Sequence, residues 1–300
     1  MSKVTFSIIL MFALAQVIGI FTGIGLIGLA RVEPQLMEFN ISPTEDVNSI
    51  SNAFFIFIYM MVGAAALFVV LKVYKGIILF NIINFLVVFL GSNVVFLVMF
   101  NHFDIPFNLS ILYSILVSLL LAGLNILRSE INNFAAIISS SGVGALFGFS
   151  IGFYPAIVLV VLLAIYDYWA VFKTKHMIKF ATEFGKRKLP FFVSSKETRR
   201  IKEKLESSKG VVEVEKEVEG GSISLGTGDI AIPVMLAVSS YDAFGFEGVI
   251  AVFIGCVFGL SAIVSMVYKN RIFLPAIPPI CLGGLLSLLV LEIVRSVILF

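Results

Sequence analysis

Charged residues are scarce in this sequence. Asp, Glu, Lys and Arg make up 13% of its 300 residues, whereas 59% are hydrophobic, and the mean hydropathy is +1.07. A typical soluble domain carries about 25% charged residues, so a soluble protein is excluded. The composition instead predicts an all-α polytopic membrane protein, and no nucleic-acid partner is expected.

Histidine and cysteine are almost absent. The two histidines, His102 and His176, lie near opposite faces of the predicted membrane protein and form no H-E-x-x-H motif, which excludes that class of metalloprotease. Cys256 and Cys281 both fall within apolar runs, which excludes a disulfide framework or a thiolate metal site. We therefore expect neither a metal nor a cofactor.

Long apolar runs are what the sequence has in abundance. A membrane helix needs about 20 apolar residues, and runs of about that length predict nine spans: 4–30, 50–71, 77–100, 107–127, 131–151, 156–172, 223–241, 248–268 and 272–294. The uncharged stretch 131–166 is too long for one span and is divided at Gly152–Pro155, where Gly and Pro favour a turn. The first run lacks a cleavage site, so we expect it to remain as a span.

The basic residues predict the orientation of these spans. Lys3, Lys72, Lys75, Arg128, Lys269, Arg271 and the segment after the sixth span all fall on one side of a nine-span arrangement. The positive-inside rule makes that side cytoplasmic, which places the C-terminus outside. Three regions follow: a six-span bundle (1–176), a cytoplasmic hydrophilic loop (177–222) and a three-span unit (223–300).

The hydrophilic segment 173–221 holds 13 of the 21 basic residues, against 8 acidic ones. A solvated linker close to anionic lipid headgroups is the simplest interpretation. At its end, Val212, Val214 and Val218 alternate with glutamates, and this period of two predicts a short β-strand just before the seventh span.

Two aspartates are the most unusual residues, because an acid within a membrane span is costly and usually functional. Asp167 lies six residues before Lys173 and Asp229 ten residues after Glu219, so both are expected at a similar depth below the cytoplasmic face. No Lys, Arg or His falls within any predicted span. Two such carboxyl groups that meet should share one proton.

A pair of carboxyl groups sharing a proton is what an aspartic protease requires. One carboxylate activates a water molecule, and the protonated partner polarises the peptide carbonyl. Gly226 and Gly228 allow another backbone to approach closely, and Pro233 leaves the carbonyl of Asp229 without its helical donor.

These residues resemble a known family. Tyr166–Asp167, the G-T-G-D run of Gly226, Thr227, Gly228 and Asp229, and the P-A-I-P run of Pro275, Ala276, Ile277 and Pro278 are similar to the motifs of the G-x-G-D intramembrane aspartyl proteases, the presenilin and signal peptide peptidase group. The family motif has Leu where this chain has Ile277. The resemblance implies that Asp167 and Asp229 are catalytic and that the other motif residues shape the site.

The resemblance also implies the fold, orientation and substrate. A cytoplasmic loop between spans six and seven corresponds to the presenilin orientation, and the small size is similar to an archaeal-type presenilin homologue. The expected substrate is a transmembrane protein or peptide, with membrane lipid as a further partner and a homo-oligomer left open. Cleavage needs an extended peptide, so Val211–Glu219 or the stretch around Pro275–Pro278 is expected to pair with the substrate as a strand.

Other functions remain to be weighed against this one. A proton- or cation-coupled transporter also uses paired acids within the membrane. A serine protease has the hydroxyls of Ser139–Gly144 but no base near them, so this segment is expected to pack helices closely. A membrane scaffold leaves both aspartates unexplained.

Overall fold

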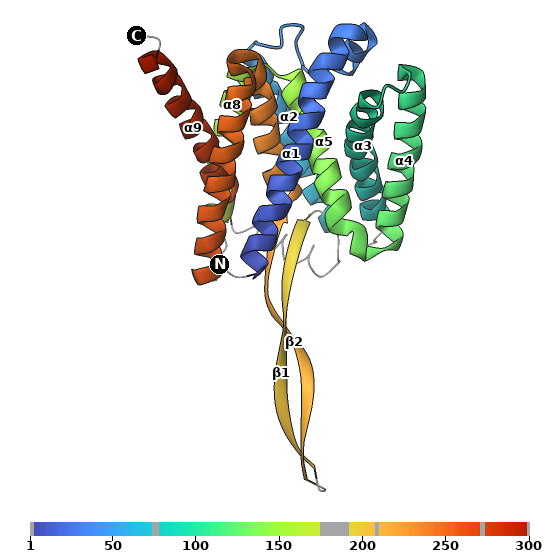
Figure 1. Ribbon diagram of the computed structural model, residues 1–300, viewed down its shortest axis with the longest axis vertical. Helices are drawn as coiled ribbons and strands as arrows, with labels where there is room; N and C mark the ends of the chain where they lie inside the picture. The colour runs from blue at the N-terminus through green and yellow to red at the C-terminus, as the bar shows by residue number, and fades with distance from the viewer. Residues whose placement is uncertain (1–2, 74–77, 175–191, 208–209, 271–273, 299–300) are drawn as a thin grey trace.

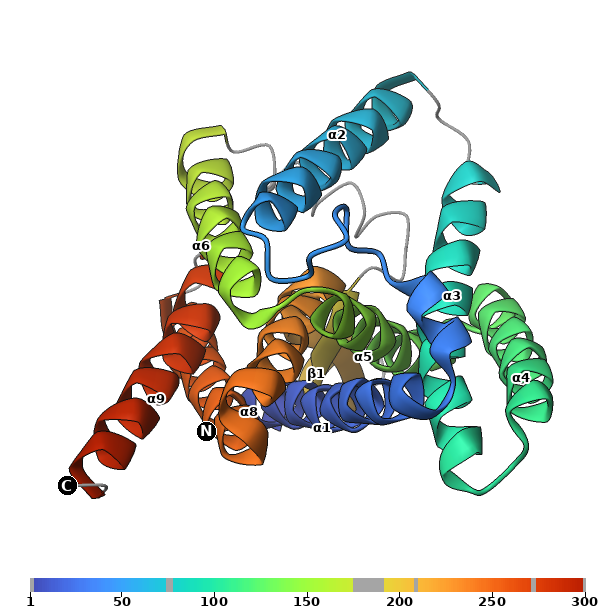
Figure 2. The same cartoon turned by 90° about the horizontal axis from the view of Figure 1, so that it is seen from above.

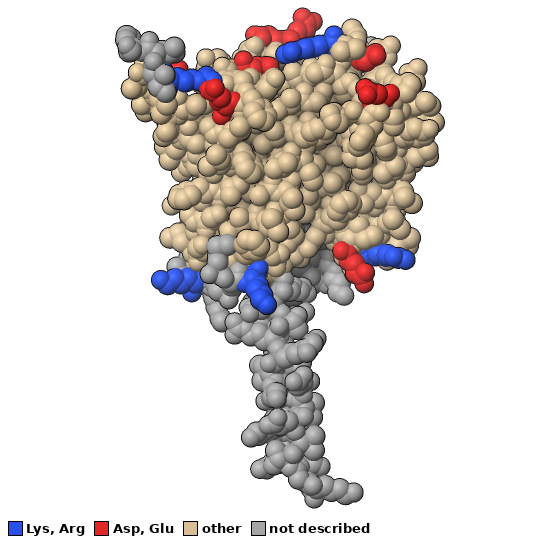
Figure 3. Space-filling view, viewed as in Figure 1, with Lys and Arg blue, Asp and Glu red and all other residues tan. Residues whose placement is uncertain are grey.

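The computed structural model describes residues 3–73, 78–174, 192–207, 210–270 and 274–298. A bundle of long helices forms the body of the protein, and a two-stranded hairpin projects from one end (Figure 1). On the face shown in Figure 3, the charged side chains lie at the two ends of the bundle, with a belt free of charge between them. This distribution is that of a multi-pass membrane protein.

The helices follow the predicted runs. They are α1 (Lys3–Val32), α2 (Ser51–Val73), α3 (Ile78–His102), α4 (Phe107–Leu127), α5 (Asn132–Ser150), α6 (Phe153–Trp169), α8 (Thr227–Asn270) and α9 (Ile277–Ile298). Within the described residues, seven of them are long and apolar enough to cross a membrane, and α2 contributes a shorter apolar stretch. Because the backbone of α8 is non-helical at Gly245 (φ 65°, ψ −158°), α8 comprises two helices. Counted in this way, the described residues contain the nine predicted segments.

Helix α5 lies at the centre of the bundle, between α1, α3 and α8 (Figure 2). Its serines and glycines allow the backbones to approach closely: the Ser141 hydroxyl donates to the carbonyl of Ala15 at 2.7 Å. A Cβ atom on Gly142 would collide with the backbone of Gly91 in α3. The segment Ser139–Gly144 therefore packs helices, as predicted.

The predicted division between α5 and α6 is confirmed at Gly152. Its amide donates to the carbonyl of Val47 at 2.9 Å, and a Cβ atom there would collide with Asn48. Glycine permits this contact with the loop before α2. Pro155 falls in the first turn of α6, where the missing N–H breaks no helical hydrogen bond.

The strand predicted before the seventh span is present but longer. Strand β2 (Gly210–Gly226) pairs antiparallel with β1 (Phe192–Ser207), which the sequence did not predict. The predicted start of the seventh span at residue 223 was wrong, because β2 continues to Gly226 and α8 begins at Thr227. At the base of the hairpin, the paired residues Val193 and Leu225 are buried in the main core. The apolar residues at the end of β2 are therefore buried as part of a strand and not of a helix.

The predicted start of the ninth span at residue 272 was also wrong. Residues 274–276 are not helical, and α9 begins at Ile277. Pro278 and Pro279 lie in its first turn, a position that proline tolerates because the first amides of a helix have no helical acceptor. The N-terminal turns of α8 and α9 thus lie on the same side of the bundle as the hairpin (Figure 1).

Candidate active site

Asp167 lies two residues before the end of α6, where the helix continues into a wider turn over Ala170–Thr174. The residue is only 6% exposed. Its Oδ2 atom accepts a hydrogen bond from the backbone amide of Ile277 at 3.3 Å. The partner of this buried carboxyl group is therefore a free N–H in the first turn of α9, where the helix dipole also favours negative charge.

Asp229 is the third residue of α8. Its Oδ2 atom accepts a hydrogen bond from the amide of Gly226 at 3.2 Å. A side chain that reaches back from this position to the residue before the helix is the acidic half of a capping box. The same interaction fixes the carboxyl group at the junction between β2 and α8.

The fold brings the two carboxyl groups together. Helix α6 packs against both α8 and α9. Asp167 is close enough to Asp229 for the two carboxyl groups to interact electrostatically. Among the described residues, neither aspartate forms an ion pair. The site therefore holds two acids whose described partners are backbone amides, an arrangement in which one proton shared by the pair lowers the repulsion.

The remaining motif residues differ in their exposure and in their contacts. Pro275 is buried and Ala276 half-buried in the non-helical approach to α9. Tyr166 turns toward α2, where its ring meets the ring of Phe57 edge-on at 6.4 Å. Thr227 is half-buried and Gly228 is exposed at the start of α8.

Two amide side chains that support the site were not predicted. Asn133, at the start of α5, donates to the carbonyl of Ser194 at 2.8 Å and accepts from its amide at 3.0 Å, as a neighbouring strand would. Gln16, fully buried in α1, donates from Nε2 to the carbonyl of Ile230 at 3.2 Å. Gln16 is the only amide side chain in the run 4–30, and that isolation was the available signal.

No group of three or more His, Cys, Asp or Glu side chains among the described residues could hold a metal ion. The described geometry is thus that of a two-carboxylate site within a helical membrane protein. Two carboxyl groups that share a proton can serve as the acid and the base of peptide hydrolysis.

Residues 9–297 match the family model described as signal-peptide peptidase, presenilin aspartyl protease. The chain belongs to this family and is an intramembrane aspartyl protease, whose substrates are transmembrane segments. The transporter alternative has no support. No curated protein is similar enough to match.

Two solved structures share the fold, and both are described as a presenilin family intramembrane aspartate protease. The form in space group C222 is 20% identical, with a TM-score of 0.64 over 95% of this chain and 97% of that one. The P2 form is 21% identical, with a TM-score of 0.59 over 92% and 95% of the two chains.

The two glycines of the G-T-G-D run should respond differently to alanine. A Cβ atom on Gly226 would lie 3.1 Å from Oδ2 of Asp229, whereas one on Gly228 meets nothing within 4 Å. Because small displacements of reacting groups are expensive, Gly226→Ala should lower kcat for a single-span peptide by about tenfold, and Gly228→Ala by much less. Equal losses in both variants would contradict this geometry.

Proposed function

We propose that Asp167 and Asp229 are the catalytic pair of this protease. The observation that carries the proposal is their placement: two carboxyl groups from different helices, close enough to interact, each accepting one backbone N–H at the start of a helix. With one proton between them, the pair contains both a base and an acid.

The reaction uses the pair twice. The ionised carboxylate takes a proton from a water molecule as the water oxygen attacks the peptide carbonyl carbon, while the protonated carboxyl group donates to the carbonyl oxygen. The resulting gem-diol collapses when one hydroxyl returns its proton to a carboxylate and the amide nitrogen is protonated by the other carboxyl group. The C–N bond breaks, an acid and an amine leave, and the pair again holds one proton.

The other motif residues are assigned to shaping the substrate site. Pro275, Ala276, Ile277 and Pro278 form the wall beside Asp167, where the Ile277 amide holds the carboxyl group. Gly226, Thr227 and Gly228 form the approach to Asp229, and Gly228 leaves open space there. Tyr166 is assigned to the face toward α2.

Replacing either aspartate by asparagine should abolish cleavage of a single-span peptide in detergent. The double variant should be no worse than either single variant, because residues that act as a unit are non-additive. The wild-type rate should follow a bell-shaped pH curve, since both the fully protonated and fully ionised pairs are inactive.

Asp242→Asn provides a matched control, since Asp242 is an exposed acid in α8. It should retain full activity, and the asparagine variants should remain folded, because removing a charge without a basic partner relieves repulsion. Near wild-type cleavage by either Asp167→Asn or Asp229→Asn would eliminate the assignment.

The substrate is proposed to bind as an added strand on β2. Ser194 on β1 gives both its backbone groups to Asn133, so the pair Ser194–Ser224 does not exchange hydrogen bonds between the strands. In an antiparallel ladder the N–H and C=O of Ser224 then point away from β1, as does the Gly226 amide that meets Asp229. The outer edge of β2 at 222–226 leads directly to the acid.

Ser224→Pro should test this edge, because proline removes one outward N–H and is compatible with an edge strand. Cleavage should fall severalfold, through KM more than kcat, whereas Ser224→Ala, which keeps the N–H, should behave as wild type. Deleting residues 211–219 tests the alternative position farther along β2. If the proline variant is fully active and the deletion is not, the substrate strand pairs farther from the membrane.

The orientation is proposed from charge: the hairpin end is cytoplasmic and the end of α9 is outside. The segment 173–221, which contains most of the hairpin, holds 13 of the 21 basic residues, so the positive-inside rule makes the hairpin end cytoplasmic. Arg200→Cys, made in a background where Cys256 and Cys281 are replaced by alanine, should react with an impermeant maleimide only from the cytoplasmic side of oriented vesicles. Reaction from the outside alone would reverse the assignment.

A further inference from the structure

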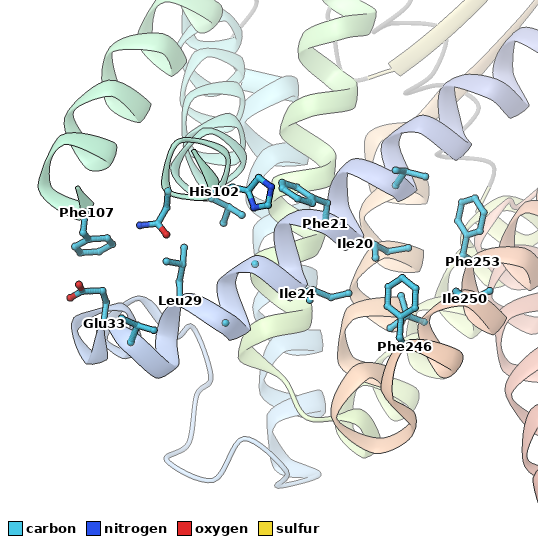
Figure 4. Close-up of a pocket in the computed structure, with 17 residues that line it drawn as sticks. Ile20, Phe21, Ile24, Leu29, Glu33, His102, Phe107, Phe246, Ile250 and Phe253 are labelled. Atoms are coloured by element: carbon cyan, nitrogen blue, oxygen red, sulfur yellow. The ribbon is translucent and has the colours of Figure 1, made fainter. Parts of the chain in front are cut away.

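A cavity of about 770 Å³ lies between α1, α3 and the second half of α8 (Figure 4). None of the predicted site residues lines it. Most of its wall is hydrocarbon, including Ile20, Ile24, Val98, Phe246, Ile250 and Phe253. Two of these side chains, Phe246 and Ile250, are exposed on the outer surface of the bundle, so the cavity is open to the bilayer.

The polar side chains of the cavity gather at one end, away from the hairpin. They are Glu33, which follows α1, and Asn101 and His102 in the last turn of α3. Among the described residues, Glu33 forms no ion pair. From Val17 to Glu33 the axis of α1 rises about 24 Å, which exceeds one half of a hydrocarbon core of about 30 Å. The cavity therefore runs from the membrane interior to the interface.

We infer that this cavity binds one membrane phospholipid whose headgroup carries an amine. An acyl chain would lie along α1 against the aromatic and branched side chains. At the interface, the Glu33 carboxylate matches the ammonium group of the headgroup, and the Asn101 amide and the His102 ring supply N–H donors for its phosphate. A zwitterionic headgroup satisfies both kinds of partner, whereas an anionic glycerol headgroup leaves Glu33 facing negative charge.

Two glycines offer a matched test. A Cβ atom on Gly28, which lines the cavity, meets nothing within 4 Å, and the same holds for Gly63 on α2. Leucine at either position should fit the fold, but only Gly28→Leu fills the cavity. Native mass spectrometry should show one phosphatidylethanolamine retained by wild type and by Gly63→Leu, and none by Gly28→Leu.

Added lipid separates the roles of chain and headgroup. Phosphatidylethanolamine should raise the melting temperature of the wild type in detergent more than phosphatidylglycerol does, and Glu33→Gln should lose that preference while still retaining a lipid. Equal retention by both leucine variants would overturn the inference, as would an equal response to both lipids in wild type. Retention of a second protein copy in place of lipid would also overturn it.

Gln16 of α1 donates a hydrogen bond to the turn of α8 that follows Asp229. The carbonyl of Asp229 lacks its usual helical donor because residue 233 is proline, and a proline ring disturbs the turn before it. Gln16 donates to the carbonyl of the next residue, Ile230, within that turn. The Ile230 carbonyl can accept this bond in addition to one from the helix, because a carbonyl oxygen has two lone pairs. The Oε1 atom of Gln16 has no partner among the described residues.

We propose that Gln16 is a positioning residue that fixes the turn of α8 carrying Asp229; this rests on the proposed function. Helix α1 is itself held in place beside Gln16, because the Ser141 hydroxyl of α5 donates to the carbonyl of Ala15, the residue next to Gln16. Gln16→Met preserves the length of the side chain but removes the donor. Its kcat should fall by about tenfold with KM within twofold, since the error is in the placement of a reacting group.

Gln16→Glu gives a readout that a packing role would not produce. A carboxyl group donates to the Ile230 carbonyl only when protonated, so the activity of this variant relative to wild type should rise as the pH falls. Asp229 is the titratable group on the facing start of α8, and α5 contains none. Ser92→Ala is the control: it removes a buried hydroxyl that donates to the Val88 carbonyl within α3, and its kcat should be unchanged.

These variants test the positioning role of Gln16 separately from the catalytic role of Asp229. If Gln16→Met keeps the wild-type kcat while Asp229→Asn is inactive, the positioning role is wrong and the catalytic assignment stands. An active Asp229→Asn removes the catalytic assignment itself. If Gln16→Glu shows the wild-type pH profile, the hydrogen bond to Ile230 does not control the site.

Discussion

The site depends on how the protein holds two carboxyl groups that have no basic partner among the described residues. Among the described residues, Asp167 and Asp229 each accept a backbone N–H, from Ile277, the first residue of α9, and from Gly226, the residue before α8. The first amides of a helix are free to donate, and the helix dipole adds partial positive charge. These amides favour a carboxylate without neutralising it, so the pair can hold one proton and exchange it.

This way of holding the acids requires helices that begin inside the site. Helix α9 starts at Ile277 because residues 274–276 are not helical and Pro278 and Pro279 are suited to a first turn. Helix α8 starts at Thr227 because β2 of the hairpin continues to Gly226. The hairpin thus has two consequences. It defines where α8 begins, and its outer edge ends beside Asp229, where an extended substrate is proposed to pair.

Much of this was readable from sequence, because membrane spans and isolated acids are local signals. The long apolar runs predicted the helices, and the absence of basic residues within them made Asp167 and Asp229 conspicuous. The starts of α8 and α9 were predicted four or five residues too early. For α8 the cause is non-local: Leu225 is apolar enough to extend a helix, but pairing with Val193 in β1 makes it a strand residue. The role of Gln16 depends on a contact 214 residues away, which no local pattern reveals.

The central claim is that the two aspartates share one proton between two helix starts. Infrared difference spectroscopy tests it most directly, by comparing wild type with the double variant Asp167→Asn and Asp229→Asn near the pH of maximal activity. The account predicts that wild type shows the carbonyl stretch of one protonated carboxyl group that the double variant lacks. Two such groups, or none, at that pH would contradict it.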